Sequence, residues 1–126
     1  LDIVDQANEE IERDKYVAMI RTSPKHLQAA LYAALVGKPR NKCLHTGDAY
    51  MVYEQFCENV GMPALTQRAF TDLLSELDMY GFIRARTVSK GRYGRSKEIN
   101  VSLAPEIMAA ILKVIRSNFD IGGGES

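Results

Sequence analysis

The chain has 126 residues, of which 46% are hydrophobic and 25% charged, and its 16 basic and 16 acidic residues give a formal net charge of zero. This length and composition are ordinary for one soluble globular domain. No apolar run approaches the roughly 18 residues of a membrane span, and two cysteines are too few for a disulfide framework. The zero net charge excludes a uniformly basic nucleic-acid-binding protein, so such a function requires segregated charges.

The first half of the chain carries helical signals. Residues 2–21 have a loose apolar stripe among acids, which favours a helix and suits a connector from a preceding domain. Ser23 as N-cap and Pro24 at the first helical position predict a helix over residues 24–36. Its predicted buried face, at helical spacing, consists of Leu27, Ala30, Leu31, Ala34 and Leu35.

The middle of the chain predicts a short strand and two more helices. Residues 42–45 suit a strand, Thr46 is the expected cap of the next helix, and Gly61 is its expected end. Thr66 is the expected cap of the third helix, and Gly81 is its expected C-terminal cap. The core face of that third helix is predicted to hold Phe70, Leu73, Leu74 and Leu77.

From Phe82 the hydrophobic period changes to two, and two alternating runs surround a glycine-containing turn. This pattern predicts a β-hairpin. Pro105 then opens a last helix, whose inward residues are expected to be Ile107, Ile111, Val114 and Ile115. The fold class is therefore mainly α with a β-hairpin wing, a winged helix-turn-helix with extra N-terminal and C-terminal helices. The predicted divisions are a connector helix over 1–22, a winged-helix domain over 23–118 and a disordered tail over 119–126.

The tip of the predicted hairpin is cationic. No acidic residue occurs from Tyr80 to Lys97, and the sequence KGRYGR fills residues 90–95. Lysines on an exposed edge ribbon also prevent aggregation, which is the plainer interpretation. That interpretation explains poorly the run Gly91-Arg92-Tyr93-Gly94-Arg95, a combination suited to phosphates and a narrow minor groove. The predicted DNA-binding wing consists of Lys90, Gly91, Arg92, Tyr93, Arg95 and Lys97.

The third helix is the second candidate for contact with DNA. In a helix-turn-helix, the first residues of the recognition helix reach base edges, and here these are Thr66, Gln67, Arg68 and Thr71. Later positions are acidic and would repel phosphate, so only the first turn or two is expected to enter a groove. An ordinary solvated helix face is the alternative interpretation.

The sequence contains no catalytic motif as distinctive as the basic hairpin, so the chain is predicted to be non-catalytic. The glycines of GRYGRS lack the spacing of a phosphate-binding loop and join two strands. Cys43 and His45 form one close pair of metal-ligand types, whereas a zinc site needs four ligands. His45 is expected on the surface, and His26 is expected exposed or packed between helices. No metal and no cofactor are expected in this chain.

These segments together resemble a known family. EEIERDKYVAMIRTSPKHLQAALYAAL, TGDAYMVYEQFCENVG, LTQRAFTDLLSELDMYGFI and VSKGRYGRSKEINV are similar to the C-terminal winged-helix domain of archaeal replication initiators. These initiators are related to the eukaryotic origin-recognition and cell-division-cycle loader subunits. The resemblance implies binding of double-stranded origin DNA by the recognition helix and wing, and recruitment of the replicative helicase. Family members also carry an AAA+ ATPase domain that uses ATP and magnesium, and none of its motifs occurs in this chain.

The expected molecule is therefore a monomeric DNA-binding domain that works in the cytoplasm at the nucleoid, without contact with a membrane. Two alternatives remain open from the residues. One is a winged helix that contacts a protein such as the replicative helicase. The other is a winged-helix transcription regulator, which would dimerise and bind a palindrome.

Overall fold

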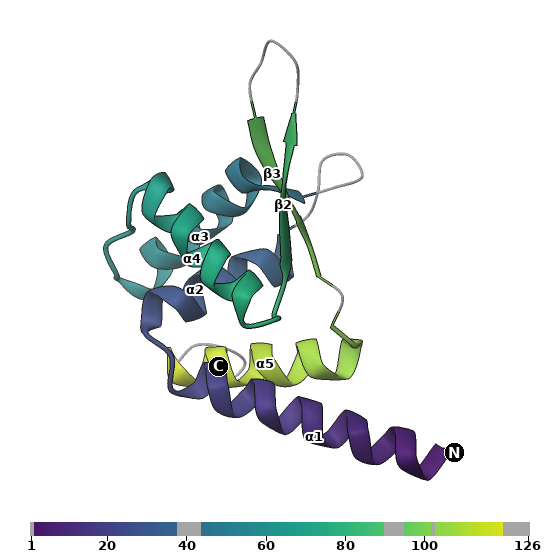
Figure 1. Ribbon diagram of the computed structural model, residues 1–126. Coiled ribbons are helices and arrows are strands. Elements are labelled where there is room, and N and C mark those ends of the chain that lie inside the picture. Colours follow the sequence, from purple (N-terminus) through teal and green to yellow (C-terminus); the bar gives the residue numbers. More distant parts are fainter. Residues whose placement is uncertain (1, 38–43, 90–94, 102, 120–126) are drawn as a thin grey trace. The chain divides into compact units, whose positions relative to one another are not determined.

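The computed structural model describes residues 2–37, 44–89, 95–101 and 103–119 (Figure 1). Contacts divide the chain into two compact units, one from residues 25–102 and one from residues 1–24 with 103–126. Among the described residues no helix is long and apolar enough to cross a membrane.

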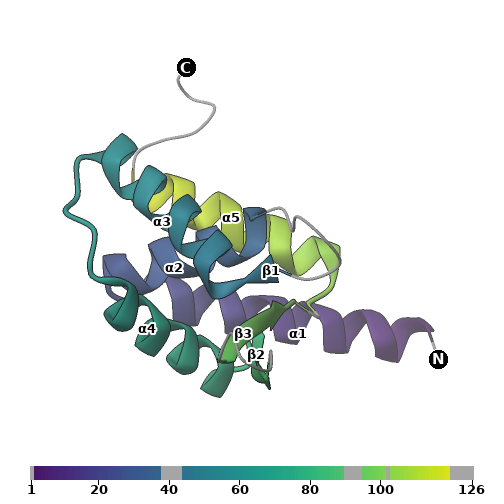
Figure 2. The same cartoon turned by 90° about the horizontal axis from the view of Figure 1, so that it is seen from above.

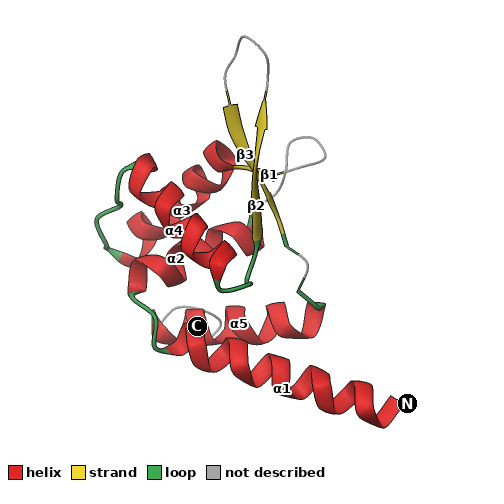
Figure 3. Ribbon diagram, in the orientation of Figure 1, coloured by secondary structure: helices red, strands yellow, loops and turns green. Residues whose placement is uncertain are grey.

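The unit of residues 25–102 holds three helices and a small sheet (Figure 3). The helices are α2 (Lys25–Val36), α3 (Thr46–Val60) and α4 (Gln67–Met79). The strands are β1 (Leu44–His45), β2 (Arg84–Ser89) and β3 (Arg95–Asn100). They form an antiparallel sheet in the order β1-β3-β2, with Leu44 opposite Ile99 and Ala85 also opposite Ile99. This arrangement confirms the predicted winged helix-turn-helix.

The core of this unit is aromatic and aliphatic. Helix α2 packs against both α3 and α4 and lies between them in the view of Figure 2. Tyr53 of α3 lies on Phe70 of α4, with ring centroids 4.9 Å apart. Ile83, directly before β2, and Ile99 of β3 continue the core, and both are buried. The other large buried side chains of the unit include Leu31, Phe56, Leu74, Leu77 and Phe82.

Both predicted glycine stops are confirmed. Gly61 has a φ of 74°, and beyond it the amide of Met62 donates to the carbonyl of Cys57 at 2.8 Å. Gly81 has a φ of 89°, and the amide of Phe82 donates to the carbonyl of Leu77 at 3.0 Å. Such six-residue closures satisfy the last helical carbonyls and need a left-handed residue, which glycine adopts without a steric penalty.

Two predicted helix starts differ from the structure. The prediction that Thr46 caps α3 is wrong: His45 stands at the N-cap position without a side-chain cap, and Thr46 is the first helical residue. The Thr46 hydroxyl donates instead to the carbonyl of Lys97 at 3.3 Å, which ties α3 to β3. Helix α2 begins at Lys25, one residue later than predicted, and the Ser23 hydroxyl donates to the carbonyl of Met19 at 2.8 Å.

The second unit contains α1 (Asp2–Arg21) and α5 (Pro105–Asn118), which pack against each other. Pro105 occupies the first turn of α5, as predicted. The Asn118 side chain donates to the carbonyl of Arg21 at 3.3 Å. Among the described side chains of this unit, the buried apolar ones are Ile20, Ile107, Ile111 and Ile115.

The contacts group the helices differently from the predicted divisions 1–22 and 23–118. They join α5 to α1, whereas the sequence placed both the wing and the last helix in one domain. Three residues predicted for core faces, Leu35, Leu73 and Val114, are only half-buried. The predicted tail over 119–126 lies, after Phe119, outside the described residues.

Candidate nucleic-acid interface

The amino end of α4 is capped and open to solvent. The Thr66 hydroxyl accepts a hydrogen bond from the amide of Ala69 at 3.2 Å, which confirms the predicted cap. Thr66, Gln67 and Arg68 are all exposed. Thr71, one turn further, is half-buried and its hydroxyl donates to the carbonyl of Gln67 at 2.9 Å. The first turn of α4 therefore presents an amide, a guanidinium and the positive end of the helix dipole to the same solvent.

The carboxyl end of α4 has a structural use for one of its acids. Asp78 Oδ2 accepts a hydrogen bond from the amide of Ala85 at 3.4 Å, so this carboxylate joins the end of α4 to the start of β2. Asp72 is exposed and Glu76 is half-buried. The negative charge of α4 thus lies beyond its first turn, as the sequence indicated.

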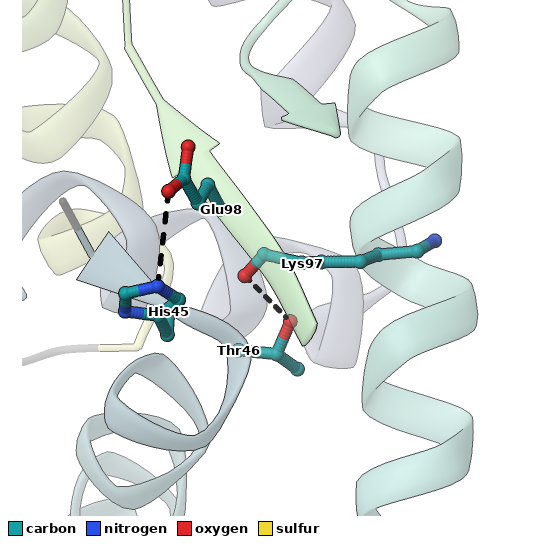
Figure 4. Close-up of polar contacts among 4 residues, drawn as sticks. All are labelled: His45, Thr46, Lys97 and Glu98. Carbon is teal, nitrogen blue, oxygen red and sulfur yellow. Dashed lines mark hydrogen bonds and ion pairs between the residues drawn. The ribbon is translucent and has the colours of Figure 1, made fainter. Parts of the chain in front are cut away.

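Lys97 connects β3 of the hairpin to α4. Its ammonium donates to the Ser75 hydroxyl of α4 at 3.1 Å, and that hydroxyl donates in turn to the carbonyl of Thr71 at 3.3 Å. Figure 4 shows the Lys97 side chain extended from β3 toward α4. A cation from the hairpin therefore lies on the exposed side of α4. Sequence reasoning missed Ser75, because only the hairpin register reveals which strand residue meets it.

The opposite face of the hairpin carries two further cations. Arg84 pairs with Asn100 and Arg86 with Glu98, and directly paired residues of antiparallel strands point to the same side. Arg84 and Arg86 are exposed, and alternation along the strands puts them on the face away from Lys97. The basic side chains of the hairpin stem are thus divided between its two faces.

His45 lies beside Glu98 on this outer face (Figure 4). Its Nε2 is 3.9 Å from a carboxylate oxygen of Glu98 and is buried without a hydrogen-bond partner. The expectation that His45 is a surface residue is therefore only half right, since its side chain is 23% exposed.

The predicted wing tip falls mainly on residues 90–94, so Lys90, Gly91, Arg92 and Tyr93 lie outside the described residues. Arg95 stands in β3, where it pairs with Ser89. The structure thus describes Lys97 in full and the backbone position of Arg95, and the remaining wing residues stay a prediction.

Two tyrosines of α3 hold the turn that leads into α4. The Tyr50 hydroxyl donates to the carbonyl of Leu65 at 2.7 Å, and the Tyr53 hydroxyl accepts from the amide of Leu65 at 3.0 Å. The Tyr53 oxygen also lies 2.8 Å from Nδ1 of His26 in α2. Burial raises the pKa of Tyr53 to about 12, although the bond from the Leu65 amide acts in the opposite direction. Leu65 directly precedes the cap, so these hydroxyls fix the entry of α4.

The described residues contain no group of three His, Cys, Asp or Glu side chains that could hold a metal ion. Cys57 is a free thiol in the core, and burial raises its pKa. His26 is half-buried and bonded to Tyr53, which agrees with packing between helices. Cys43 lies outside the described residues.

Comparison with known proteins identifies the family. The model of the family described as CDC6, C terminal winged helix domain, matches residues 18–110. The chain belongs to this family. Its membership agrees with the initiator family that the sequence segments resemble.

Relatives of this CDC6-type domain are longer proteins. ORC1-type DNA replication protein 4 of Haloarcula marismortui is 45% identical over 112 residues, which cover 88% of this chain and 21% of that protein. ORC1-type DNA replication protein 1 of Methanosarcina acetivorans is 44% identical over 112 residues, covering 86% and 27% respectively. The chain thus spans about a quarter of the length of these relatives or less.

Solved structures give the same fold. The Aeropyrum pernix ORC1 protein, solved in complex with DNA, matches with a TM-score of 0.82 and 29% identity, over 94% of this chain and 30% of that one. The Pyrobaculum aerophilum Cdc6p structure matches with a TM-score of 0.60 and 20% identity over 81% of this chain and 26% of its own. The latter likeness concerns the fold alone.

Proposed function

We propose that this CDC6-type winged helix binds double-stranded DNA at replication origins, as the DNA-binding part of an archaeal replication initiator. The observation that carries the proposal is the open amino end of α4, with exposed Gln67 and Arg68, together with the ammonium of Lys97, which bonds Ser75 about two turns further along the same helix. The likeness to an ORC1 protein solved with DNA supports the same conclusion.

The chemistry of α4 suits both bases and phosphates. Arginine can bond guanine O6 and N7 together, and glutamine can do the same at adenine N6 and N7. A phosphate fits the free amides and positive dipole at the start of a helix. The acids beyond the first turn restrict insertion to Thr66, Gln67, Arg68 and Thr71, so base contacts are few.

The wing supplies most of the cations in this proposal. Lys90, Arg92 and Arg95 would bond phosphates or enter the minor groove, Tyr93 would pack on sugar, and Gly91 would let the backbone come close. Since phosphate contacts carry no sequence information, the wing contributes affinity and orientation while α4 contributes base contacts.

The function of this chain is binding, not catalysis, and needs neither ATP nor magnesium within these residues. ATP hydrolysis would belong to the AAA+ part of the full-length initiator, outside the stretch that the relatives share with this chain. Recruitment of the replicative helicase is a second role for the full-length protein. The domain itself would act as a monomer.

Duplex binding measured as a function of salt tests the proposal. If three wing cations neutralise phosphates, log K falls against log salt with a slope of about −2.7. Fluorescence anisotropy of a labelled duplex gives this slope, and Arg92→Ala with Arg95→Ala flattens it while leaving the melting temperature nearly unchanged. Absence of duplex binding at low salt overturns the proposal. A dimer in sedimentation would favour the transcription regulator instead.

A further inference from the structure

A groove follows the second half of α3 and the turn after it. It has a volume of about 440 Å³ and lies among Met51, Glu54, Gln55, Cys57, Glu58, Met62 and Ala64. These residues belong to the unit of residues 25–102 and include none of those assigned to DNA. The groove is therefore a surface that the proposed function leaves unused.

The apolar part of the groove is not required by the core. Tyr53 and Phe56 of α3 face the core and are at most 4% exposed, and Cys57, which is 1% exposed, both belongs to the core and borders the groove. Met51 points elsewhere and is 58% exposed. Methionine is flexible and polarizable, so it adapts to apolar surfaces of many shapes and is common at binding surfaces. Together with Met62 and Ala64 it gives the groove an apolar lining.

The polar part of the groove is acidic. Glu54 and Glu58 are one helical turn apart on α3, so they share a face, and both are exposed. The described residues that line the groove include no lysine or arginine. Two carboxylates repel phosphate, which excludes DNA as the occupant, and they favour a cationic one.

We propose that this groove docks a basic amphipathic helix of a partner protein. Apolar side chains of that helix would fill the space between Met51 and Met62, and its lysines or arginines would lie over Glu54 and Glu58. This is helix-in-groove recognition, in which apolar anchors recur at helical spacing and charges fix the orientation. The partner would bind next to the turn that precedes Thr66, while the first turn of α4 remains open.

An NMR titration tests the proposal. The probe is a 14-residue peptide with leucines on one helical face and lysines on the other, added to the ¹⁵N-labelled chain. Saturable amide shifts confined to residues 51–64 are expected, and a peptide with glutamate in place of lysine should cause none. Shifts spread over the acidic residues 2–14, or no saturation, would overturn the proposal.

Matched variants separate the groove from general charge. Met51→Lys with Glu58→Lys should weaken peptide binding at least about tenfold, because it removes an apolar anchor and reverses a charge. Met79→Lys with Glu12→Lys adds the same charge elsewhere, at a methionine that is 72% exposed and at an exposed acid, and should leave binding unchanged. If both double variants lost the same affinity for the peptide, binding would depend on net charge alone, which would contradict docking in the groove. Thermal melting of both establishes that each is folded.

Discussion

Leu65 is held at both of its backbone groups by side chains of α3. Tyr50 bonds its carbonyl and Tyr53 bonds its amide, while His26 contacts the Tyr53 hydroxyl from α2. The Tyr53 oxygen accepts from Leu65, so its own proton is available for Nδ1 of His26. Hydrophobic periodicity does not reveal where the hydroxyl of a tyrosine finds its partner. This is why the sequence did not identify Tyr50 and Tyr53 as the residues that position α4.

Replacing Tyr53 with phenylalanine should lower the free energy of unfolding by about 1 kcal/mol, since the Leu65 amide loses its acceptor. The variant should also alter the alkaline limit of stability. The pKa of Tyr53 is about 12 in the folded chain and 10 in the unfolded one. Folding thus binds the proton more tightly, and the contribution to stability is complete below pH 10 and is lost as pH rises through about 12.

Urea unfolding at several pH values between 7 and 12 measures both effects. Wild type should lose more stability between pH 10 and 12 than Tyr53→Phe does. Tyr80→Phe, at a residue that is 39% exposed, serves as the control and should follow wild type. Equal losses of stability in wild type and Tyr53→Phe over this pH range would contradict a role of Tyr53 in the alkaline limit of stability.

At the scale of elements, the sequence predicted the type and order of the helices and strands that the structure describes. Changes of hydrophobic period located the helices and the hairpin, and glycines located the ends of α3 and α4. The predicted cap of α3 was wrong, because a threonine hydroxyl near the start of a helix can bond other groups, and that of Thr46 bonds a strand carbonyl 51 residues away. The side-chain bond from Lys97 to Ser75 could not be predicted either, because the sequence does not show which residue of β3 faces α4.

Arg68 is expected to be the main reader of sequence on α4. Arg68→Ala should reduce discrimination between a duplex selected from a random pool and an unselected duplex by about 1–3 kcal/mol, if the guanidinium bonds one guanine at two atoms. Competition binding measures this difference. Arg116→Ala, at an exposed arginine of α5, is the control and should preserve discrimination. Equal losses of affinity for both duplexes would indicate that Arg68 contacts a phosphate and not a base.

At the scale of the whole molecule, the contacts join the first and last helices of the chain. The apolar stripe of α5 was predicted from sequence, with Ile107, Ile111 and Ile115 inward, and all three are buried. An apolar stripe predicts that one face of a helix is buried, but it does not reveal which element buries that face. Periodicity therefore could not predict that α5 packs against α1. This is the physical reason why the predicted division at residue 22 separated two helices that pack together.

Ile111→Ala should open the unit of α1 and α5 before the unit of residues 25–102. Truncation of a buried isoleucine costs about 2–5 kcal/mol, and the loss falls on the contacts that the side chain makes. Native-state hydrogen exchange should accelerate more in α1 and α5 than in α3 and α4. Leu74→Ala, in the core of the other unit, should give the reverse pattern. Uniform acceleration in both variants would indicate a single cooperative unit.

Lys97 is attached at two points, through its carbonyl to Thr46 of α3 and through its ammonium to Ser75 of α4. These bonds hold the stem of the hairpin against both α3 and α4 in the chain without a ligand. A binding surface that is already preorganised loses less conformational entropy on association, so more of its contact energy becomes affinity. In the proposed function, a duplex that suits this arrangement of hairpin and α4 would be favoured, and one that required the two elements to separate would be penalised by the bonds that must break.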